Sequence, residues 1–309
     1  MNMSRHDFFC YVDGEMKTLV RIKQSSTVRN YKTALNALER YLGRRSLPFS
    51  HITRQLIQDF EQWLWHCGLC RNTSSAYLRS LQSLFNRAVD KHLVREHNPF
   101  RRVFTGNEKT EKRGLRTSEL RLLLHTDIGS DSRLRQARDV FCFSLAVCGM
   151  PFVDVAHLQW SQIEGGRLVY RRRKTGSRLS IRLEAEALSI LKRYGYERDG
   201  NNSDGFIFPL LHADANDDNV YRNTLAAYNR RLQRIGQRAG LKRRLTSYVV
   251  RHTWASLAQL HDMPVAVTQK GLGHTSLRTT AFYLADMADD RLDCCNRRLL
   301  HTIFEKNTE

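Results

Sequence analysis

Two short stretches in the last third of the chain decide its interpretation: RHTWASLA (residues 251–258) and GLGHTSLRTTAFYL (residues 271–284). Arg251 interrupts an apolar helical pattern, so its charge needs either an ion pair or an anionic ligand such as a phosphate. His274 follows Gly273, where it could equally cap a helix. Tyr283 comes nine residues after His274, and taken alone it would be interpreted as a core tyrosine.

A strongly basic hairpin precedes these stretches. The segments GRLVYRRRKTG (residues 166–176) and SRLSIRL (residues 177–183) meet at a Thr-Gly-Ser turn, and the second alternates apolar with polar residues, as strands do. The basic residues of the hairpin are Arg171, Arg172, Arg173, Lys174, Arg178 and Arg182. A second basic cluster consists of Lys242, Arg243 and Arg244. Each cluster is either a surface that contacts phosphates or part of a catalytic site.

The charge balance indicates a polyanionic partner. Of the 309 residues, 50 are Lys or Arg and 31 are Asp or Glu, which gives a net charge of +19. Basic side chains on a nucleic acid release condensed counterions, which favours binding; the alternative is that the charge serves solubility. No apolar run reaches the roughly 18 residues of a membrane span, and residues 1–10 are too polar for a signal peptide. We therefore expect a cytoplasmic, nucleoid-associated protein with no membrane partner.

The cysteines predict free thiols. Their number is seven, and they are scattered along the chain. Cys67 and Cys70 form a lone C-x-x-C, and no second pair stands at a spacing suited to a four-ligand zinc site. A redox or metal role for this pair is the minor alternative, and we expect neither a metal nor another cofactor.

The periodicity of apolar residues predicts a mainly α fold with a small antiparallel sheet, in two domains. Residues 1–25 are expected to form an arm that could include one strand. Residues 26–104 are expected to form a helical domain, with one helix ending at Gly43, a second capped by Thr53 and a third beginning near Asn72. Residues 105–116 are the expected linker. Residues 117–309 are expected to form an α+β domain that ends in a packing helix.

Taken together, the motifs resemble the tyrosine recombinase (phage integrase) family, in particular integrases and invertases of bacterial mobile elements. The two opening stretches are similar to its R-H-x-x-A-[ST] … L-G-H-[ST]-S-x-x-T-T-x-x-Y pattern. The segment CGMPFVDVAHLQWSQI (residues 148–163) resembles its G-M-x-x-x-D-x-x-x-L helix, and the basic hairpin resembles the family's lysine-bearing hairpin. The resemblance covers roughly residues 25–290. It implies a two-domain clamp, with a helical (SAM-like) core-binding domain and an α+β catalytic domain.

The resemblance also implies roles for individual residues. Tyr283 takes the place of the nucleophile, Arg251 of the second catalytic arginine, His274 of the family's His/Trp position and Lys174 of the general acid. In the implied reaction, the tyrosine attacks a DNA phosphodiester, the 5′-hydroxyl leaves and a 3′-phosphotyrosyl bond forms. Arg171, Arg173, Arg178, Lys242, Arg243 and Arg244 are the expected DNA-binding residues.

Two positions depart from the family pattern. Pro151 stands where the first catalytic arginine is expected. Arg172 could replace that cation, because strand alternation would place it on the same face as Lys174; alternatively the enzyme is slow, or it only binds DNA. Tyr248 stands at the second His/Lys position, where its phenol could donate to a phosphate oxygen or could pack in the core.

The expected function is site-specific DNA recombination, in integration, excision or inversion. The alternative is a catalytically impaired DNA-binding regulator on a recombinase scaffold, which the two departures would favour. A metal-dependent nuclease would need a carboxylate cluster that the sequence does not offer. The expected partners are double-stranded DNA with paired recombination sites, further copies of the chain in a tetramer on DNA, and possible accessory DNA-bending proteins. Too few residues precede the first expected helix for an additional arm-binding domain.

Overall fold

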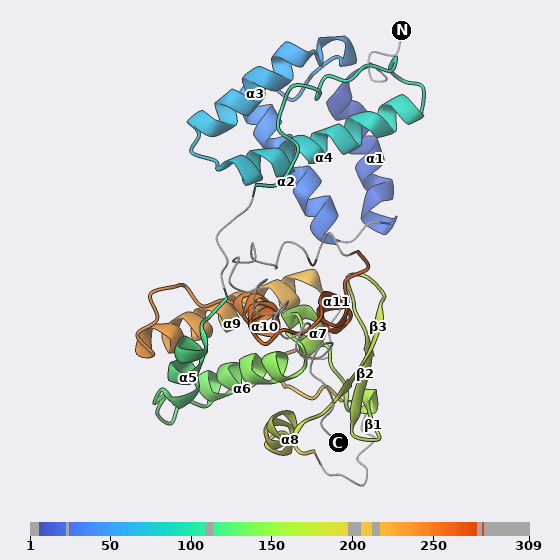
Figure 1. The fold of residues 1–309 in the computed structure, drawn as a ribbon. Helices are drawn as coiled ribbons and strands as arrows, with labels where there is room; N and C mark the ends of the chain where they lie inside the picture. The colour runs from blue at the N-terminus through green and yellow to red at the C-terminus, as the bar shows by residue number, and fades with distance from the viewer. Residues whose placement is uncertain are drawn as a thin grey trace, which may run out of the picture. The chain divides into compact units, whose positions relative to one another are not determined.

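Figure 1 shows the computed structural model, which describes residues 6–22, 25–108, 114–196, 205–211, 217–276 and 280. The chain divides into two compact units, residues 1–110 and 111–309. Among the described residues the secondary structure is helical apart from one small sheet and isolated bridges. The predicted class, mainly α with a small antiparallel sheet, is thus confirmed. No helix in the described part of the chain is long and apolar enough to cross a membrane.

The first unit is a helical bundle. Its elements are α1 (Phe8–Ile22), α2 (Ser25–Leu42), the 3-10 helix η2 (Phe49–His51), α3 (Arg54–His66) and α4 (Arg71–Asp90). The expected helix signals function as predicted: Thr53 caps α3 by accepting a hydrogen bond from the Leu56 amide at 3.2 Å, and Gly43 follows α2 with a φ of 67°. The core gathers the apolar faces of these helices around Phe60 and Phe85.

The expectation for the first 25 residues is wrong where the structure describes them. In place of the predicted arm with a strand, the chain forms the helix α1. The strand-like pairing of the described part of this stretch is an isolated bridge between Asp7, just before α1, and Pro48. The physical reason is the spacing of its apolar residues, which recur every three or four positions and are buried in the core: Phe8, Phe9, Val12, Met16 and Leu19. At the other end, the chain still packs on this unit beyond Pro99, through Phe100 and Val103.

The second unit packs helices around α6 and carries the sheet. Its helices are α5 (Thr117–His125), α6 (Ser132–Ala146), α7 (Phe152–Ala156), η3 (Trp160–Gln162), α8 (Ala185–Lys192), α9 (Asp218–Arg238), α10 (Val249–Leu260) and α11 (Val265–Leu272). Helices α8, α9 and α10 all contact α6, and α11 contacts both α10 and strand β3. These contacts bring the end of α11 and the hairpin together (Figure 1).

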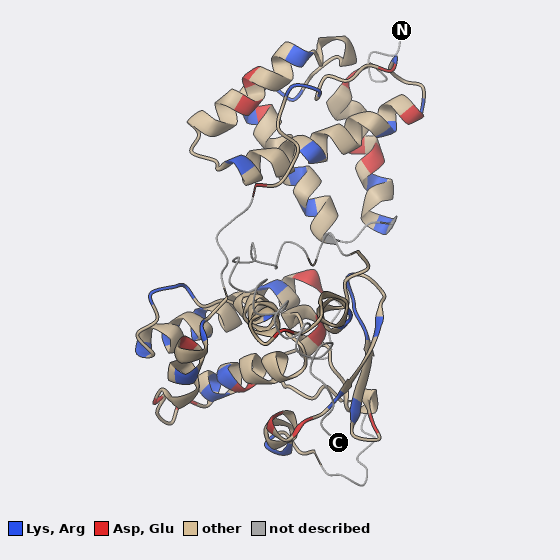
Figure 2. Ribbon diagram, viewed as in Figure 1, with Lys and Arg blue, Asp and Glu red and all other residues tan. Residues whose placement is uncertain are grey.

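The sheet has three antiparallel strands in the order β1 (Ile163–Glu164), β2 (Arg167–Arg171) and β3 (Arg178–Arg182). The predicted hairpin is β2–β3, with Tyr170 opposite Leu179. The two-residue strand β1 was not predicted, because it is too short to show alternation. Figure 2 shows Lys and Arg on the hairpin and on the loop between α9 and α10. The predicted nucleophile Tyr283 and the predicted packing helix lie outside the described residues.

Candidate active site

Arg251 is the centre of the candidate site. It lies in the first turn of α10, and only 3% of its surface is exposed. Its Nη1 donates to the Gly149 carbonyl at 3.1 Å, and its Nη2 donates to the Leu272 carbonyl and to His274 Nε2. Gly149 allows this approach, because a Cβ there would lie 3.1 Å from the Arg251 Cα. These contacts tie α10 to the loop before α7 and to the end of α11.

Arg172 converges on the same point from the hairpin. It follows β2 directly and is 6% exposed. Its Nη1 donates to the carbonyls of Leu272 and Gly273, at 3.0 and 2.9 Å. The Leu272 carbonyl therefore accepts from both Arg172 and Arg251. This carbonyl lies at the C-terminal end of α11, where the partial negative charge of the helix favours cations.

Gly273 is required for Arg172 to reach this position. Its backbone is left-handed, with a φ of 61°, and a Cβ there would lie 2.5 Å from the Arg172 Cδ and 3.0 Å from the Leu179 Cδ1. Any other residue would therefore combine backbone strain with a clash against the arginine.

His274 is held in a defined protonation state. Because an arginine can only donate, His274 Nε2 accepts from Arg251 Nη2 at 2.9 Å, so the ring proton lies on Nδ1, which faces Thr280 Oγ1 at 2.9 Å. Burial and the nearby Arg251, Arg172 and Lys174 lower the pKa of His274 to about 4. The imidazole is neutral at pH 7. The capping alternative also holds for its backbone, because the His274 amide donates to the Gln269 carbonyl behind Gly273.

Asp154 on α7 is a member of the cluster that the sequence did not single out. It is 4% exposed, its Oδ1 accepts from the Arg173 amide at 2.9 Å, and its Oδ2 lies 3.7 Å from Arg172 Nε. Burial raises its pKa, opposed by the Arg173 amide, Arg172 and Arg251. The aspartate of the G-M-x-x-x-D segment was visible in the sequence, but nothing there indicated its partner. Pro151 is the N-cap residue of α7, and its carbonyl accepts from the amides of Asp154 and Val155.

The predicted face of the hairpin is wrong for one residue. Arg172 and Lys174 were expected on one face, but β2 ends at Arg171, and Arg172 closes the turn by pairing with Ser177 and Gly176. Alternation therefore does not extend to Lys174, which is exposed in the turn while Arg172 points into the cluster. Lys174 is still close enough to contribute to the lowered pKa of His274.

The predicted DNA-binding residues are all exposed. They are Arg171, Arg173 and Arg178 on the hairpin and Lys242, Arg243 and Arg244 on the loop between α9 and α10. Tyr248, immediately before α10, is also 52% exposed, and its ring contacts that of His252 at 4.6 Å between centroids. The alternative that Tyr248 packs in the core is therefore wrong.

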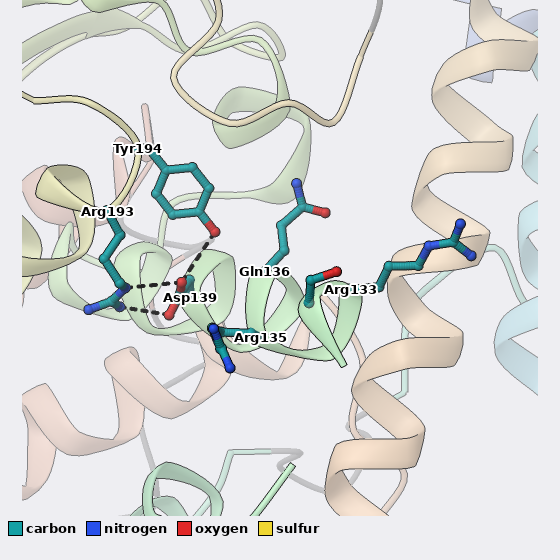
Figure 3. Close-up of a pocket in the computed structure, with 7 residues that line it drawn as sticks. Arg133, Arg135, Gln136, Asp139, Arg193 and Tyr194 are labelled. Carbon is teal, nitrogen blue, oxygen red and sulfur yellow. Dashed lines mark hydrogen bonds and ion pairs between the residues drawn. The ribbon is translucent and has the colours of Figure 1, made fainter. Parts of the chain in front are cut away.

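A hollow elsewhere in the unit contains none of the predicted site residues. It lies between the start of α6 and the end of α8, and its lining includes Arg133, Arg135 and Gln136 (Figure 3). Asp139 accepts hydrogen bonds there from Arg193 Nη2 at 2.7 Å and from the Tyr194 hydroxyl at 3.2 Å. This network joins α6 to the residues that follow α8, and burial and Asp139 raise the pKa of the Tyr194 hydroxyl, which makes it a poor nucleophile. Among the described residues, no group of three His, Cys, Asp or Glu side chains could hold a metal ion.

The second unit thus combines two buried arginines, a histidine and a basic hairpin, an arrangement that suits an enzyme acting on the phosphates of DNA. Family models give the same result. Residues 7–106 match the phage integrase SAM-like domain, and residues 113–289 match the phage integrase family. The chain therefore belongs to the phage integrase family, and it is a site-specific tyrosine recombinase.

Relatives and solved structures agree with this assignment. The tyrosine recombinase XerD of Pseudomonas putida is 23% identical over 258 residues, which cover 82% of this chain and 84% of the relative. A tyrosine recombinase of Thermosipho africanus is 23% identical over 290 residues, covering 90% of this chain and 95% of the relative. The fold is similar to that of a lambda integrase dimer bound to a COC′ core site, with a TM-score of 0.68 at 18% identity over 90% of this chain and 95% of that one.

Proposed function

We propose that Arg172 and Arg251 together bind the scissile phosphate, and that Arg172 supplies the cation that Pro151 does not. The observation that carries this proposal is the carbonyl oxygen of Leu272, which accepts a hydrogen bond from both guanidinium groups. Two buried like charges that share one neutral acceptor repel each other, and their burial is costly. A phosphate placed beside them would remove that cost, because its oxygens match the donor geometry of arginine.

The remaining chemistry follows from the charge that develops during cleavage. Tyr283 attacks phosphorus, and negative charge builds on the nonbridging oxygens, where the arginines stabilise it. An ordinary tyrosine has a pKa near 10, so nearby positive charge helps Tyr283 to lose its proton to solvent as it attacks. Lys174, exposed on the turn, gives a proton to the departing 5′-oxygen. The phosphotyrosyl bond conserves the energy of the phosphodiester, so rejoining requires no ATP, and the arginines provide the charge stabilisation that a metal ion gives in other phosphoryl-transfer enzymes.

His274 and Tyr248 have more modest roles in this proposal. His274 Nε2 accepts from Arg251, so the imidazole orients that arginine and donates to the phosphate only when Nε2 carries a proton. Tyr248 is exposed, and its hydroxyl can donate to a nonbridging oxygen. The exposed residues of the hairpin and of the loop between α9 and α10 contact the DNA backbone.

The partners follow from the same reasoning. Solved structures with a similar fold include a lambda integrase tetramer bound to a Holliday junction, with a TM-score of 0.65 at 20% identity. We therefore propose that this chain binds double-stranded DNA with both of its domains and associates into a tetramer on paired recombination sites. DNA-bending proteins are possible accessories, and a DNA-acting enzyme of this kind would work at the nucleoid in the cytoplasm. Inverted repeats flanking its gene would distinguish inversion from integration or excision.

A nicked suicide substrate tests the nucleophile. Cleavage close to the nick releases a short fragment, which traps the covalent protein–DNA adduct. We expect an adduct with the wild-type chain and none with Tyr283→Phe. Tight DNA binding without any adduct in the wild type would instead favour the alternative of a DNA-binding regulator.

The same substrate tests Arg172. The Arg172→Ala variant should lose cleavage by about a hundredfold or more, the effect of one preorganised donor, with little change in DNA affinity. Arg171→Ala is the matched control, because Arg171 is an exposed neighbour on the same hairpin and its loss should weaken binding without a comparable loss of the cleavage step. Wild-type cleavage by Arg172→Ala would rule out the assigned role.

A further inference from the structure

The Asp154–Arg172 pair has an unusual feature. Asp154 Oδ2 and Arg172 Nε are both buried, and neither has a hydrogen-bond partner among the described residues. The two atoms lie 3.7 Å apart, whereas an N–H···O hydrogen bond is about 2.9 Å long. Buried polar atoms in folded proteins are nearly always paired. A pair of charged groups left slightly too far apart at a candidate active site therefore calls for a functional explanation.

The surrounding contacts show what holds each partner. Asp154 is fixed from one side, because its Oδ1 accepts from the Arg173 amide. Arg172 is fixed from the other side, because its Nη1 donates to the carbonyls of Leu272 and Gly273 at the end of α11. The guanidinium thus lies with its Nε edge toward α7 and its Nη1 toward α11. Its Nη2 makes no hydrogen bond to the described residues, and Nη2 is the donor that remains for a ligand.

We propose that Asp154 is a positioning residue, whose carboxylate holds the Nε edge of Arg172 so that Nη2 faces the scissile phosphate. A movement of under about 1 Å would bring the Nε–H to hydrogen-bonding distance of Oδ2. The carboxylate also offsets part of the positive charge that Arg172 and Arg251 place together. This proposal rests on the proposed role of Arg172 in phosphate binding.

The test uses the full-length chain, the nicked duplex and single-turnover cleavage. Asp154→Asn keeps the oxygen that accepts from the Arg173 amide but removes the charge. We expect the cleavage rate to fall about ten- to hundredfold, because misplacement of a catalytic group by an ångström has effects of that size. DNA affinity should not change. In the Arg172→Ala background, Asp154→Asn should have no further effect, because the group that it positions is already absent.

Asp139→Asn is the matched control. Asp139 is the other buried aspartate of the described part of this unit, and it accepts from Arg193 and Tyr194 instead of facing the arginine cluster. Its substitution should lower the melting temperature without changing the cleavage rate of the folded protein. If Asp154→Asn does not fold, Asp154→Glu tests the position of the carboxylate instead, since it keeps the charge and displaces the carboxylate by one methylene group. Cleavage should again fall in the wild-type background and show no further loss in the Arg172→Ala background.

The outcomes separate the two proposals. If Arg172→Ala cleaves like the wild type, the proposed role of Arg172 fails. If Arg172→Ala is impaired and Asp154→Asn either cleaves normally or lowers cleavage by the same factor in both backgrounds, Asp154 does not act through Arg172 and the inference is overturned. Should Arg172→Ala cleave too slowly to measure, Arg172→Lys is the background, because it retains a cation but lacks the Nε–H. There, too, Asp154→Asn should have no further effect.

Discussion

The two units differ in the charges that they bury. Among the described residues, the buried charged side chains of the first unit are all acidic: Asp7, Glu15 and Glu61. The second unit also buries two aspartates, but in addition it buries two arginines, Arg172 and Arg251. Since burial of an ionised group is costly in either unit, the difference lies in how the charges are compensated.

In the first unit the buried carboxylates of Glu15 and Asp7 have close partners. Glu15 forms ion pairs with Arg87, at 3.3 Å, and with Lys91. Asp7 accepts from the Leu47 amide at 2.6 Å and from the Ser46 hydroxyl at 2.9 Å, and these bonds join the start of α1 to the chain before η2. Such charges serve the native structure.

In the second unit one ion pair is looser. Arg172 and Arg251 donate to backbone carbonyls, and Arg251 also donates to the neutral imidazole of His274. The carboxylate that pairs with Arg172 belongs to Asp154, and its Oδ2 lies 3.7 Å from Arg172 Nε. Asp139 in the same unit is paired as closely as the acids of the first unit. The contrast teaches that buried charge by itself does not indicate a site, whereas buried positive charge held by neutral groups indicates where an anion binds.

The largest expected effect comes from removing the central arginine. Arg251→Met keeps the apolar bulk of the side chain and removes its charge, so cleavage should fall about a hundred- to a thousandfold. The free energy of unfolding should fall by about 1–3 kcal/mol, because the buried carbonyls of Gly149 and Leu272 each lose a donor, and the chain should still fold. Cleavage of the nicked duplex and thermal melting measure the two quantities.

The control for this prediction is Arg243→Met, on the exposed loop between α9 and α10, which should reduce DNA binding and leave both the cleavage step and the melting temperature nearly unchanged. A collapse of the fold in Arg251→Met would contradict the comparison. Arg251 would then belong with the structural charges of the first unit.

A smaller effect, on stability alone, is expected in the first unit. Glu15→Gln removes the charge that compensates Arg87 and Lys91, so the free energy of unfolding should fall by about 1–2 kcal/mol, as for the loss of a charged hydrogen bond. Cleavage by the folded protein should not change. Chemical denaturation followed by circular dichroism measures the loss.

The matched variant is Glu39→Gln. Glu39 pairs with Arg45 at the surface, with 37% and 40% of the two side chains exposed, and a surface pair contributes under about 1 kcal/mol. Equal losses for Glu15→Gln and Glu39→Gln would show that the burial of Glu15 has no special value, and the contrast between the units would weaken.

The sequence predicted most of what depends on local pattern. Apolar periodicity located helices α2, α3 and α4, and the Thr-Gly-Ser turn located the β2–β3 hairpin, because both signals arise within a few neighbouring residues. Motif spacing also identified Arg251 and His274, and the structure brings these two into contact. The helix α1 was missed although its periodicity is of the same kind, because its polar flanks suggested an arm.

What the sequence could not predict depends on contacts between distant segments. Arg172 was chosen by an alternation argument that fails in the turn, and its actual position depends on the end of α11, about a hundred residues later in the chain. Asp154 pairs with a hairpin residue for the same reason. The exposure of Tyr248 reverses the local apolar pattern of Val249 and Val250, because the residue stands before the first turn of α10.

The smallest expected effect is a pH dependence. The folded chain holds the pKa of His274 at about 4, below its ordinary value of 6.5. Between these two pH values the unfolded chain binds a proton at this residue and the folded chain does not. Stability of the catalytic unit should therefore fall as the pH drops from about 6.5 toward 4, and His274→Gln should remove part of this slope. Denaturation midpoints at pH 7 and pH 5 measure the difference between the two proteins.

A bound phosphate would oppose the effect of Arg172 and Arg251 on the imidazole, so saturating uncleaved DNA should make the difference smaller. An identical slope in both proteins would mean that neither burial nor the neighbouring arginines lower the pKa of His274 in the folded chain.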